Sequence, residues 1–482
     1  MRYSPADDSA GPRTMAGKTQ AKTKRQHLIV EAVAAAVKLH QLGKLAEAEK
    51  VYAGILQFDP ACFDALNLLA KLRHVQGRGA EALELVDRAL RVARGSADAL
   101  NTRSCVLSQL DRHAEALATA ERVLVIAPRH AAALVNRGNA LQYLGRFHAA
   151  LASYEKAIAL EPDNAEAQFN AGMARLAMGD FAAGWRAYEF RWKVSGAPMN
   201  PLGGCGSQWT GAEPLAGKTI MLYPEQGLGD AIQYMRYVPL VARNAARVLV
   251  SIHPSLAPVV PPFPDNVTVL DDRAAIPPFD VHCPLLSLPL AFATEVATIP
   301  SGLSVLAPRE RMARWAERLP PRQRKRIGLV WAGSAEHKDD RNRSIVLARL
   351  LPLLDVPDTE FLSLQRDLRP GDDAILRERP QIVHLGPELA DFADTAAVIS
   401  LLDLVITVDT SVAHLAAAMG KPVWIMLPFR PDWRWLLDRE DSPWYPTVRL
   451  FRQPAPADWA SVVARVAGEA RVLPGPDHRA PP

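Results

Sequence analysis

Four short segments of the sequence bring together glycines, hydroxyls, cations and carboxylates in patterns that suit chemistry on a phosphorylated substrate. The first has two glycines, which let a ligand approach the backbone, and it precedes a helical pattern whose N-terminus would favour a negative group. Its last residue, Asp230, is either a helix cap, the usual reason for Asp at such a place, or a general base. The candidates here are Glu225, Gln226, Gly227, Gly229 and Asp230.

The second segment, V-D-T-S-V-A-H over residues 408–414, again joins an apolar run to a helical pattern. Amides exposed at the start of the helix, together with two hydroxyls, would suit a diphosphate. His414 lies one turn in, so it could reach a phosphate or brace Asp409. The alternative is a core histidine that a neighbour satisfies. The candidates are Asp409, Thr410, Ser411, Val412 and His414.

The third and fourth segments add cations and aromatic rings. A cationic loop follows the apolar run before residue 331 and suits neutralisation of phosphate, although a solvated charge run is the common alternative. The segment P-F-R-P-D-W-R-W over residues 428–435 sets aromatic rings beside arginines, which suits stacking on a base or sugar, or a packing lid. The candidates for phosphate are Lys338 and Arg343 in the third segment. The candidates for contact with a base or sugar are Trp331 and Gly333 in the third segment and Phe429 and Trp433 in the fourth.

Taken together, the four segments suit transfer of a sugar from a sugar diphosphate. A carboxylate would deprotonate the acceptor hydroxyl, while helix amides and cations would stabilise the departing diphosphate. No cluster of metal-ligand residues is visible in the sequence, so we expect neither a metal nor another cofactor beyond the nucleotide-diphosphate sugar that serves as donor.

The elements that must position these segments alternate between strand and helix. Strands are predicted at 218–223, 247–252, 267–270 and 279–283, with a helix at 230–243. A helix at 309–318 leads to a basic hinge at 320–326. A second series of strands (326–333, 361–365, 382–386, 404–409, 422–427 and 449–453) alternates with helices, one of them at 346–354. This pattern predicts two doubly wound α/β domains, 218–308 and 324–472, with ligands bound beyond the carboxyl ends of the strands.

Residues 27–195 precede these domains and repeat with a period of 34. A residue suited to a turn, a small residue five positions later and a core residue nine positions later recur in register, and a helix-stopping residue often follows. This spacing predicts five helical hairpins stacked into an α-solenoid with a concave face. The positions are Gly43, Gly77, Asp111, Gly145 and Gly179; Ala48, Ala82, Ala116, Ala150 and Gly184; Tyr52, Val86, Ala120, Tyr154 and Tyr188; and Pro60, Arg94, Pro128 and Pro162.

Two features of the array bear on its partners. Asn67, Asn101, Asn136 and Asn170 recur near the concave face, where they either bind a peptide backbone or are solvated helix polarity. Trp185, Tyr188 and Trp192 give the last helix a large apolar face, which we expect to dock on the α/β half, so that the array is fixed and not tethered.

Composition narrows the remaining interpretations. The 482 residues are 49% hydrophobic and 22% charged, with a net charge of +4, which gives no case for nucleic acid. No apolar stretch could span a bilayer, and four scattered cysteines favour a reduced, cytoplasmic protein. Residues 1–26 and 473–482 are expected to be disordered tails, the first of them basic, and 196–217 a linker.

The array resembles the tetratricopeptide repeat, and residues 218–470 resemble the bacterial heptosyltransferases, which have two facing Rossmann-like domains of the GT-B fold. The second resemblance is carried by Gly229-Asp230 followed by Pro239, and by Asp409-Thr410 with His414. It implies Asp230 as the catalytic base, the turn at 409–414 as the diphosphate site, and Lys338 or Arg343 as a phosphate ligand. The whole chain resembles bacterial proteins in which tetratricopeptide repeats are fused to such a transferase module.

The first α/β domain is short, and the part that binds a lipid-sugar acceptor in those enzymes is reduced. By analogy with repeat-bearing transferases that modify protein hydroxyls, we expect the array to recruit a protein or peptide acceptor, with a glycan as the other choice. Two alternatives remain: a scaffold whose transferase-like half is inactive, and a sensor that binds nucleotide without transfer.

Overall fold

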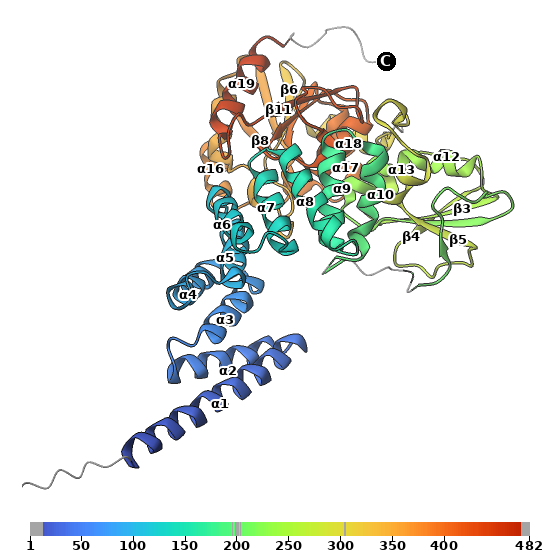
Figure 1. Ribbon diagram of the computed structural model, residues 1–482. Helices are drawn as coiled ribbons and strands as arrows, with labels where there is room; N and C mark the ends of the chain where they lie inside the picture. The colour runs from blue at the N-terminus through green and yellow to red at the C-terminus, as the bar shows by residue number, and fades with distance from the viewer. Residues whose placement is uncertain (1–12, 195, 198–201, 203, 303–304, 474–482) are drawn as a thin grey trace, which may run out of the picture. The chain divides into compact units, whose positions relative to one another are not determined.

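The computed structural model describes residues 13–194, 196–197, 202, 204–302 and 305–473 (Figure 1). Two compact units make up the chain, Met1–Ala167 and Gln168–Pro482. The first is built from helical hairpins, and the second combines a further hairpin with two parallel sheets.

The first unit contains four hairpins that follow the 34-residue period. The second helices of the hairpins start at 45, 79, 113 and 147, which are 34 residues apart, and α10 in the second unit starts at 181. The tetratricopeptide-repeat solenoid predicted from the sequence is therefore confirmed. Its helices are α1 (Arg13–Gln41), α2 (Leu45–Phe58), α3 (Phe63–Val75), α4 (Gly79–Val92), α5 (Ala97–Gln109), α6 (His113–Ile126), α7 (Ala131–Tyr143) and α8 (Phe147–Leu160).

The turn position of every repeat has a left-handed backbone. The φ angles are 74° at Gly43, 77° at Gly77, 59° at Asp111, 73° at Gly145 and 86° at Gly179. Glycine reaches this conformation without a steric cost, and Asp is among the few other residues that tolerate it. The small residues five positions later are buried between the helices, as the period predicts.

The recurrent asparagines are hydrogen-bonded within the array. Asn67 is buried, and its Nδ2 donates to Asp98 Oδ2 at 2.5 Å. The Nδ2 of Asn136 donates to Asn101 Oδ1 at 2.7 Å and to the sulfur of Cys105 at 3.1 Å. These contacts join successive repeats, so solvated helix polarity is the wrong interpretation for Asn67.

Helix α1 starts earlier than the sequence suggested. The expected disordered tail through residue 26 is wrong from Arg13 onward, while residues 1–12 lie outside the described part of the chain. The segment from 13 to 26 is rich in Lys, Arg, Gln and Ala, which are good helix formers and can extend a helix that packing has already nucleated. The tail expected at 473–482 falls almost wholly outside the described residues.

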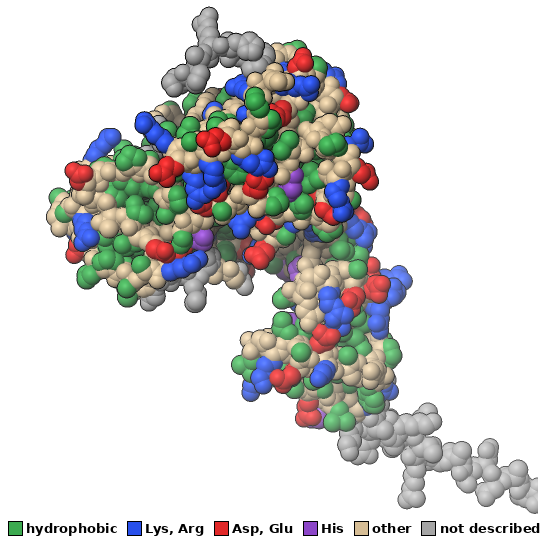
Figure 2. Space-filling view, turned by 180° about the vertical axis from the view of Figure 1, so that it is seen from behind, with side chains coloured by type: hydrophobic (Ala, Val, Ile, Leu, Met, Phe, Trp, Pro, Cys, Tyr) green, Lys and Arg blue, Asp and Glu red, His purple; other side chains and the backbone are tan. Residues whose placement is uncertain are grey.

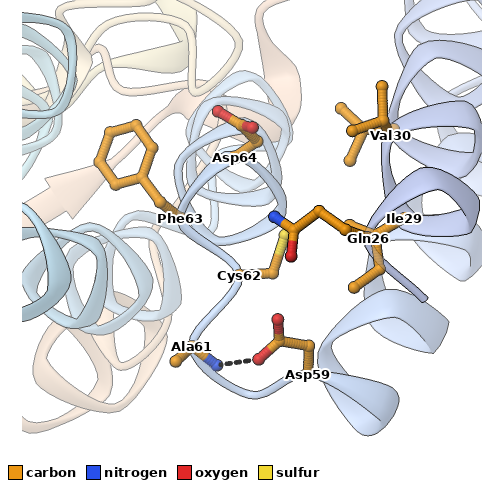
Figure 3. A pocket seen from close by; sticks show the side chains of 9 residues that line it. Gln26, Ile29, Val30, Asp59, Ala61, Cys62, Phe63 and Asp64 are labelled. Atoms are coloured by element: carbon orange, nitrogen blue, oxygen red, sulfur yellow. Dashed lines mark hydrogen bonds between the residues drawn. The ribbon is translucent and has the colours of Figure 1, made fainter. Parts of the chain in front are cut away.

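A pocket of about 260 Å³ opens in the array between α1 and the turn that joins α2 to α3 (Figure 3). Figure 3 shows Ile29 and Val30 on one side of it and Cys62 on the other, and Asp59 accepts the Ala61 amide at 3.3 Å. None of the residues chosen for chemistry from the sequence lines this pocket, so it does not bear on transfer.

The second unit begins with the fifth hairpin, α9 (Ala165–Ala177) and α10 (Phe181–Tyr188), which ends in the 3-10 turn η1 (Glu189–Trp192). Helix α9 straddles the boundary between the units. Trp185 Nε1 donates to the carbonyl of Thr294 at 2.9 Å, and the Trp185 ring lies 5.2 Å from that of Trp433. The predicted docking of the last repeat helix on the α/β half is therefore confirmed. It is also why the unit boundary falls within α9 and not at residue 195.

The first sheet has strand order β1-β5-β2-β3-β4, and all its neighbouring strands are parallel. Its strands are β1 (Ser207–Gln208), β2 (Thr219–Tyr223), β3 (Arg247–Ile252), β4 (Val267–Asp271) and β5 (Val281–Pro284). Its helical elements are α11 (Leu228–Tyr234), η2 (Met235–Tyr237), α12 (Val238–Ala242), η3 (Ala257–Val259), η4 (Leu285–Ser287), α13 (Leu288–Ala291) and η5 (Val296–Thr298).

Two expectations for this region need correction. The predicted linker at 196–217 contains β1, and Trp209 and Leu215 are buried, because these apolar side chains pack on the sheet despite the surrounding glycines and prolines. The helix predicted at 230–243 starts at Leu228 and is broken by a 3-10 turn before Pro239, whose ring cannot continue the preceding helix.

The second sheet has strand order β11-β10-β9-β6-β7-β8, also entirely parallel. Read from β8 to β11, this is the 3-2-1-4-5-6 order of a dinucleotide-binding fold, whose switch point lies between β6 and β9. Its strands are β6 (Lys325–Val330), β7 (Thr359–Ser363), β8 (Ile382–His384), β9 (Leu404–Val408), β10 (Val423–Leu427) and β11 (Val448–Arg452).

The helical elements that accompany the second sheet lie between Arg309 and Arg471. They are α14 (Arg309–Arg318), α15 (Asp340–Arg343), η6 (Leu347–Asp355), α16 (Asp372–Glu378), η7 (Gly386–Glu388), α17 (Phe392–Ser400), α18 (Ser411–Ala418), η8 (Trp433–Trp435) and α19 (Trp459–Arg471). The sequence missed α16. The helix predicted at 346–354 is the 3-10 helix η6, because Pro352 inside it removes an α-helical hydrogen bond.

The basic hinge predicted at 320–326 is anchored instead. Helix α14 packs on α17, where Trp315 Nε1 donates to Asp394 at 3.0 Å. The guanidinium of Arg322 pairs with Asp403, and Arg326 Nε donates to Glu360 at 2.8 Å. Arg322 and Arg326, which belong to the predicted hinge, therefore pair with carboxylates of the second sheet and of the turn before β9.

Acidic and basic side chains are intermingled over the face shown in Figure 2. Among the described residues, no helix has both the length and the apolar character that a bilayer crossing requires.

Candidate functional site

Asp230 lies in the first turn of α11, just beyond the carboxyl end of β2. Its Oδ2 accepts the Gly227 amide at 2.9 Å, and its Oδ1 pairs with the guanidinium of Arg434. Burial raises the pKa of Asp230 above its usual value, and Arg434 opposes that shift. The structure thus assigns Asp230 the capping contact that the sequence allowed, at the third helical position and not at the cap itself.

The turn after β9 holds the hydroxyl candidates. Thr410 occupies the cap of α18, and its Oγ1 lies 3.1 Å from the Oγ1 of Thr407, while Ser411 and Val412 are half-buried in the first helical turn. Burial and the nearby charge of Asp432 raise the pKa of Asp409 to about 6. Asp409 immediately precedes the cap residue of α18.

These two turns meet face to face. A Cβ on Gly229 would lie 2.8 Å from Cδ2 of His414 and 3.4 Å from Cα of Ser411, so only glycine fits here without displacement. The turn after β2 therefore lies against the turn after β9.

His414 is a buried, neutral histidine. Its Nδ1 hydrogen-bonds the Tyr445 hydroxyl at 3.0 Å, and its ring stacks on Trp435 at 5.5 Å. The Nε2 atom lies 3.9 Å from Asp409, too far for a hydrogen bond. Burial, followed by the charge of Arg434, lowers the pKa of His414 to about 3. The alternative interpretation, a core histidine satisfied by a neighbour, fits this geometry better.

The loop after β6 divides its candidates. Trp331 directly follows β6 and is fully buried, and its Nε1 donates to Asp372 at 2.8 Å. The expected contact of this ring with a base or sugar is therefore wrong. Arg343 Nη1 donates to the Asp409 carbonyl at 3.1 Å and fills the space where a Cβ of Gly333 would lie. Lys338 is exposed in the same loop.

The loop after β10 packs inward. The Trp433 ring lies 5.2 Å from that of Trp185 and 5.8 Å from that of Tyr188, both on α10. Phe429 is half-buried, and its amide donates to Gln453 at 3.0 Å. Trp433 therefore packs as part of a lid, which is one of the two interpretations that the sequence allowed for this segment.

A residue of the last repeat reaches into the loop after β2. Arg191 Nη2 donates to Glu225 Oε1 and to Ser287 Oγ, each at 2.8 Å, and Ser287 follows β5. Burial raises the pKa of Glu225 to about 7, although the charge of Arg191 opposes this. Gln226 Nε2 donates to the hydroxyl of Tyr188, also from the repeat, at 2.9 Å.

Sequence reasoning missed the residues that tie these segments together. Arg434, Arg191 and Tyr445 carry no spacing signal, because their partners come from other elements. Position eight of the first repeat helix was also missed, although small residues recur there with the 34-residue period at Ala70, Ser104, Gly138 and Gly172.

Comparison with protein families gives three matches. Residues 39–104 and 103–175 match tetratricopeptide repeats. Residues 373–425 match glycosyltransferase family 9 (heptosyltransferase). That match includes β9 and the turn with Asp409, Thr410 and His414, but it contains neither Asp230 nor the loops after β6 and β10.

Similar proteins cover parts of the chain. Protein FlbA of Caulobacter vibrioides is 31% identical over 298 residues, which are 54% of this chain and 48% of FlbA. The chain thus spans about half the length of this curated relative. A thermophilic TPR protein of Thermus thermophilus covers 34% of this chain and 90% of its own, at 23% identity and a TM-score of 0.32. The structure of pilF of Pseudomonas aeruginosa covers 37% of this chain and 81% of its own, at 18% identity and a TM-score of 0.33.

The chain carries tetratricopeptide repeats followed by an α/β half with a segment that matches glycosyltransferase family 9.

Proposed function

We propose that the α/β half transfers a sugar from a nucleotide-diphosphate sugar to an acceptor hydroxyl, as an inverting enzyme of GT-B type. The observation that carries the proposal is the meeting of Asp230, from the first sheet, with the turn of α18, from the second. In an open α/β sheet a ligand binds at the switch point, which in the second sheet lies between β6 and β9. The loops after these two strands hold Arg343 and Thr410.

The reaction assigns one task to each side. Asp230 takes the proton of the acceptor hydroxyl as the oxygen attacks the anomeric carbon. A new carbon–oxygen bond forms, the bond from the sugar to the diphosphate breaks, and the diphosphate leaves with the electron pair. Arg343, Lys338 and the amides of Ser411 and Val412 stabilise the charge of the leaving group. This account includes no metal, because arginine and helix amides supply the positive potential.

The array supplies the acceptor in this proposal. Its partly buried polar pair, in which Asn136 binds Asn101, offers amide groups that can exchange these partners for a peptide backbone. A protein hydroxyl is therefore the acceptor we favour. The donor's sugar and base are left open.

The test measures donor binding and turnover separately. Calorimetry across a panel of sugar nucleotides identifies the donor, and release of nucleoside diphosphate reports turnover. Asp230→Asn should lower turnover by about 10²–10⁴-fold, the range for loss of a general base. Arg343→Met should weaken donor binding. Arg377→Met is the matched control, since Arg377 pairs with Asp373 on the surface.

Two results would contradict the assignment: donor binding that Arg343→Met leaves unchanged, or turnover that survives in Asp230→Asn. The second candidate function is an inactive scaffold. It is favoured by one observation, the ion pair of Asp230 with Arg434, which neutralises the only base candidate chosen from the sequence. The scaffold predicts that no sugar nucleotide binds and that turnover is absent in the wild type.

A further inference from the structure

Arg434 pairs with carboxylates from loops of both α/β sheets. It comes from the loop after β10, yet its Nη2 pairs with Asp230 of the first sheet's loop, and its Nη1 donates to Asp432 at 2.8 Å. The guanidinium lies 4.5 Å above the Trp433 ring, and the residue is buried. Its Nε has no hydrogen-bond partner among the described residues. A buried cation thus has unused donor capacity at the place where the two turns meet.

The charges around Arg434 are unbalanced. Asp230, Asp432 and Asp409 all act on this guanidinium or on one another, and burial combined with Asp432 raises the pKa of Asp409. Arg343, a second cation of this region, is committed to the Asp409 carbonyl. The Arg434 guanidinium is therefore shared between the carboxylates of Asp230 and Asp432, and an additional anion would compete directly for it.

The loop that carries Arg434 is held in a strained form. Leu436, which ends the 3-10 turn η8, has a φ of 53°, in the left-handed region that a leucine rarely adopts. Such a conformation persists only where the surrounding contacts enforce it. The contacts include Trp433 against Trp185, Arg452 Nη2 donating to the Trp435 carbonyl, and Arg434 with Asp230, so release of the ion pair removes one restraint on the loop.

We propose that Arg434 exchanges partners: it pairs with Asp230 in the donor-free chain and with the donor's diphosphate in the complex, which frees Asp230 to act as the base. The inference rests on the proposed function. The charge of Arg434 opposes the rise in pKa that burial gives Asp230, so release of the ion pair makes this carboxylate a stronger base. A guanidinium binds phosphate oxygens in a bidentate manner, so a diphosphate is a suitable competitor for Asp230. Asp230 is then free to accept a proton only while the diphosphate of the donor is bound.

The experiment measures binding of inorganic pyrophosphate to the full chain by calorimetry, with UDP and GDP as further probes. Arg434→Met should weaken pyrophosphate binding about tenfold or more, since it removes a charge-assisted contact. Asp230→Asn should tighten binding several-fold, because the competing carboxylate is gone. Arg439→Met, which removes a surface pair with Asp441, should bind as the wild type does. Arg434→Lys keeps the charge and should fall between wild type and Arg434→Met, which leaves the test valid if the methionine variant fails to fold.

Each remaining outcome has a definite meaning. Binding that Asp230→Asn leaves unchanged or weakens overturns the exchange, even if Arg434→Met weakens it. Binding that is unaffected by Arg434→Met overturns the role of Arg434 and leaves the proposed function standing. No binding of any diphosphate by the wild type overturns both.

Discussion

Arg191, at the end of the last repeat, forms an ion pair with Glu225, at the start of the loop after β2, with 2.8 Å between Nη2 and Oε1. The Arg191 side chain is 3% exposed and that of Glu225 is fully buried. This pair joins a repeat helix to the loop that ends at Asp230. Removing one partner of a buried pair leaves the other charge uncompensated, so the contact is a sensitive place to test the docking of the repeat.

Arg191→Met should lower the free energy of unfolding of the second unit by about 3–5 kcal/mol, because Glu225 is left buried without its cation. The measurement is urea unfolding followed by tryptophan fluorescence. All ten tryptophans of the chain lie at or after Trp185, so this signal reports the second unit alone.

The double variant Arg191→Met with Glu225→Gln should recover much of the loss, since neither member of the pair is then charged. Arg78→Met is the control: Arg78 pairs with Glu81 on the exposed surface of the array, and its loss should have little effect on unfolding followed by circular dichroism. A double variant no more stable than Arg191→Met would show that the ion pair is not what Arg191 contributes.

Much of the fold follows from local patterns in the sequence. The 34-residue period placed every repeat turn, since a left-handed residue must interrupt each hairpin at the same point, and Asp111 fills that role where glycine is missing. The apolar runs that became β2, β3, β6 and β9 are buried on both faces and follow each other through helices, which is the signature of a parallel sheet.

The site was less predictable, because its decisive contacts join residues far apart in the sequence. Asp230 and Arg434 are 204 residues apart, and no periodicity links them. Trp331 looked available because it ends a strand at the ligand edge, but its partner Asp372 comes from α16, a helix that the sequence did not reveal. The linker was misread for a similar reason: β1 is two residues long and is defined by its pairing with β5.

Gly172 should not tolerate a methyl group. A Cβ there would lie 2.8 Å from the amide nitrogen of Tyr188 and 2.9 Å from the carbonyl carbon of Ala187, and backbone atoms cannot move aside as a flexible side chain does. Gly172→Ala should therefore separate α9 from α10 and lower the stability of the second unit by about 1–3 kcal/mol, measured by tryptophan fluorescence in urea.

Gly54→Ala is the matched control for this substitution. Gly54 also lies inside a helix, α2, and nothing stands within 4 Å of its added Cβ. There the gain in helix propensity should stabilise the array by about 0.5–1 kcal/mol, read by circular dichroism. Equal effects of the two substitutions would mean that the close approach of α10 does not decide the first.

His414 should make the second unit sensitive to acid. Its pKa in the folded chain is about 3, below the value of about 6.5 in an unfolded chain. Between pH 6.5 and pH 3, His414 therefore binds a proton in the unfolded chain but not in the folded chain. The free energy of unfolding falls as the pH drops through this range. Between pH 6.5 and 5 the loss is on the order of 2 kcal/mol.

The measurement compares wild type with His414→Gln at pH 7 and pH 5 by urea unfolding. The wild type should lose more stability than the variant over this interval, because the other buried groups are common to both. His27→Gln, on the exposed face of α1, controls for the loss of a histidine as such. A loss of equal size in wild type and His414→Gln would mean that His414 carries a proton in the folded chain.

Cutting the chain after Gly204, by an inserted protease recognition sequence, should leave the two fragments associated. The N-terminal fragment keeps α10 and η1, and the C-terminal fragment keeps both sheets, so the break removes the covalent connection but not the interface between them. That interface includes the hydrogen bond from Trp185 Nε1 to Thr294, the contact of Gln226 with Tyr188 and the pair of Arg191 with Glu225.

Because these groups are desolvated together, we expect the fragments to elute from a sizing column as one species in moderate salt, and Arg191→Met to promote their separation. Fragments that elute apart after cleavage of the wild type would mean that the last repeat is held against the α/β half by its tether and not by this interface.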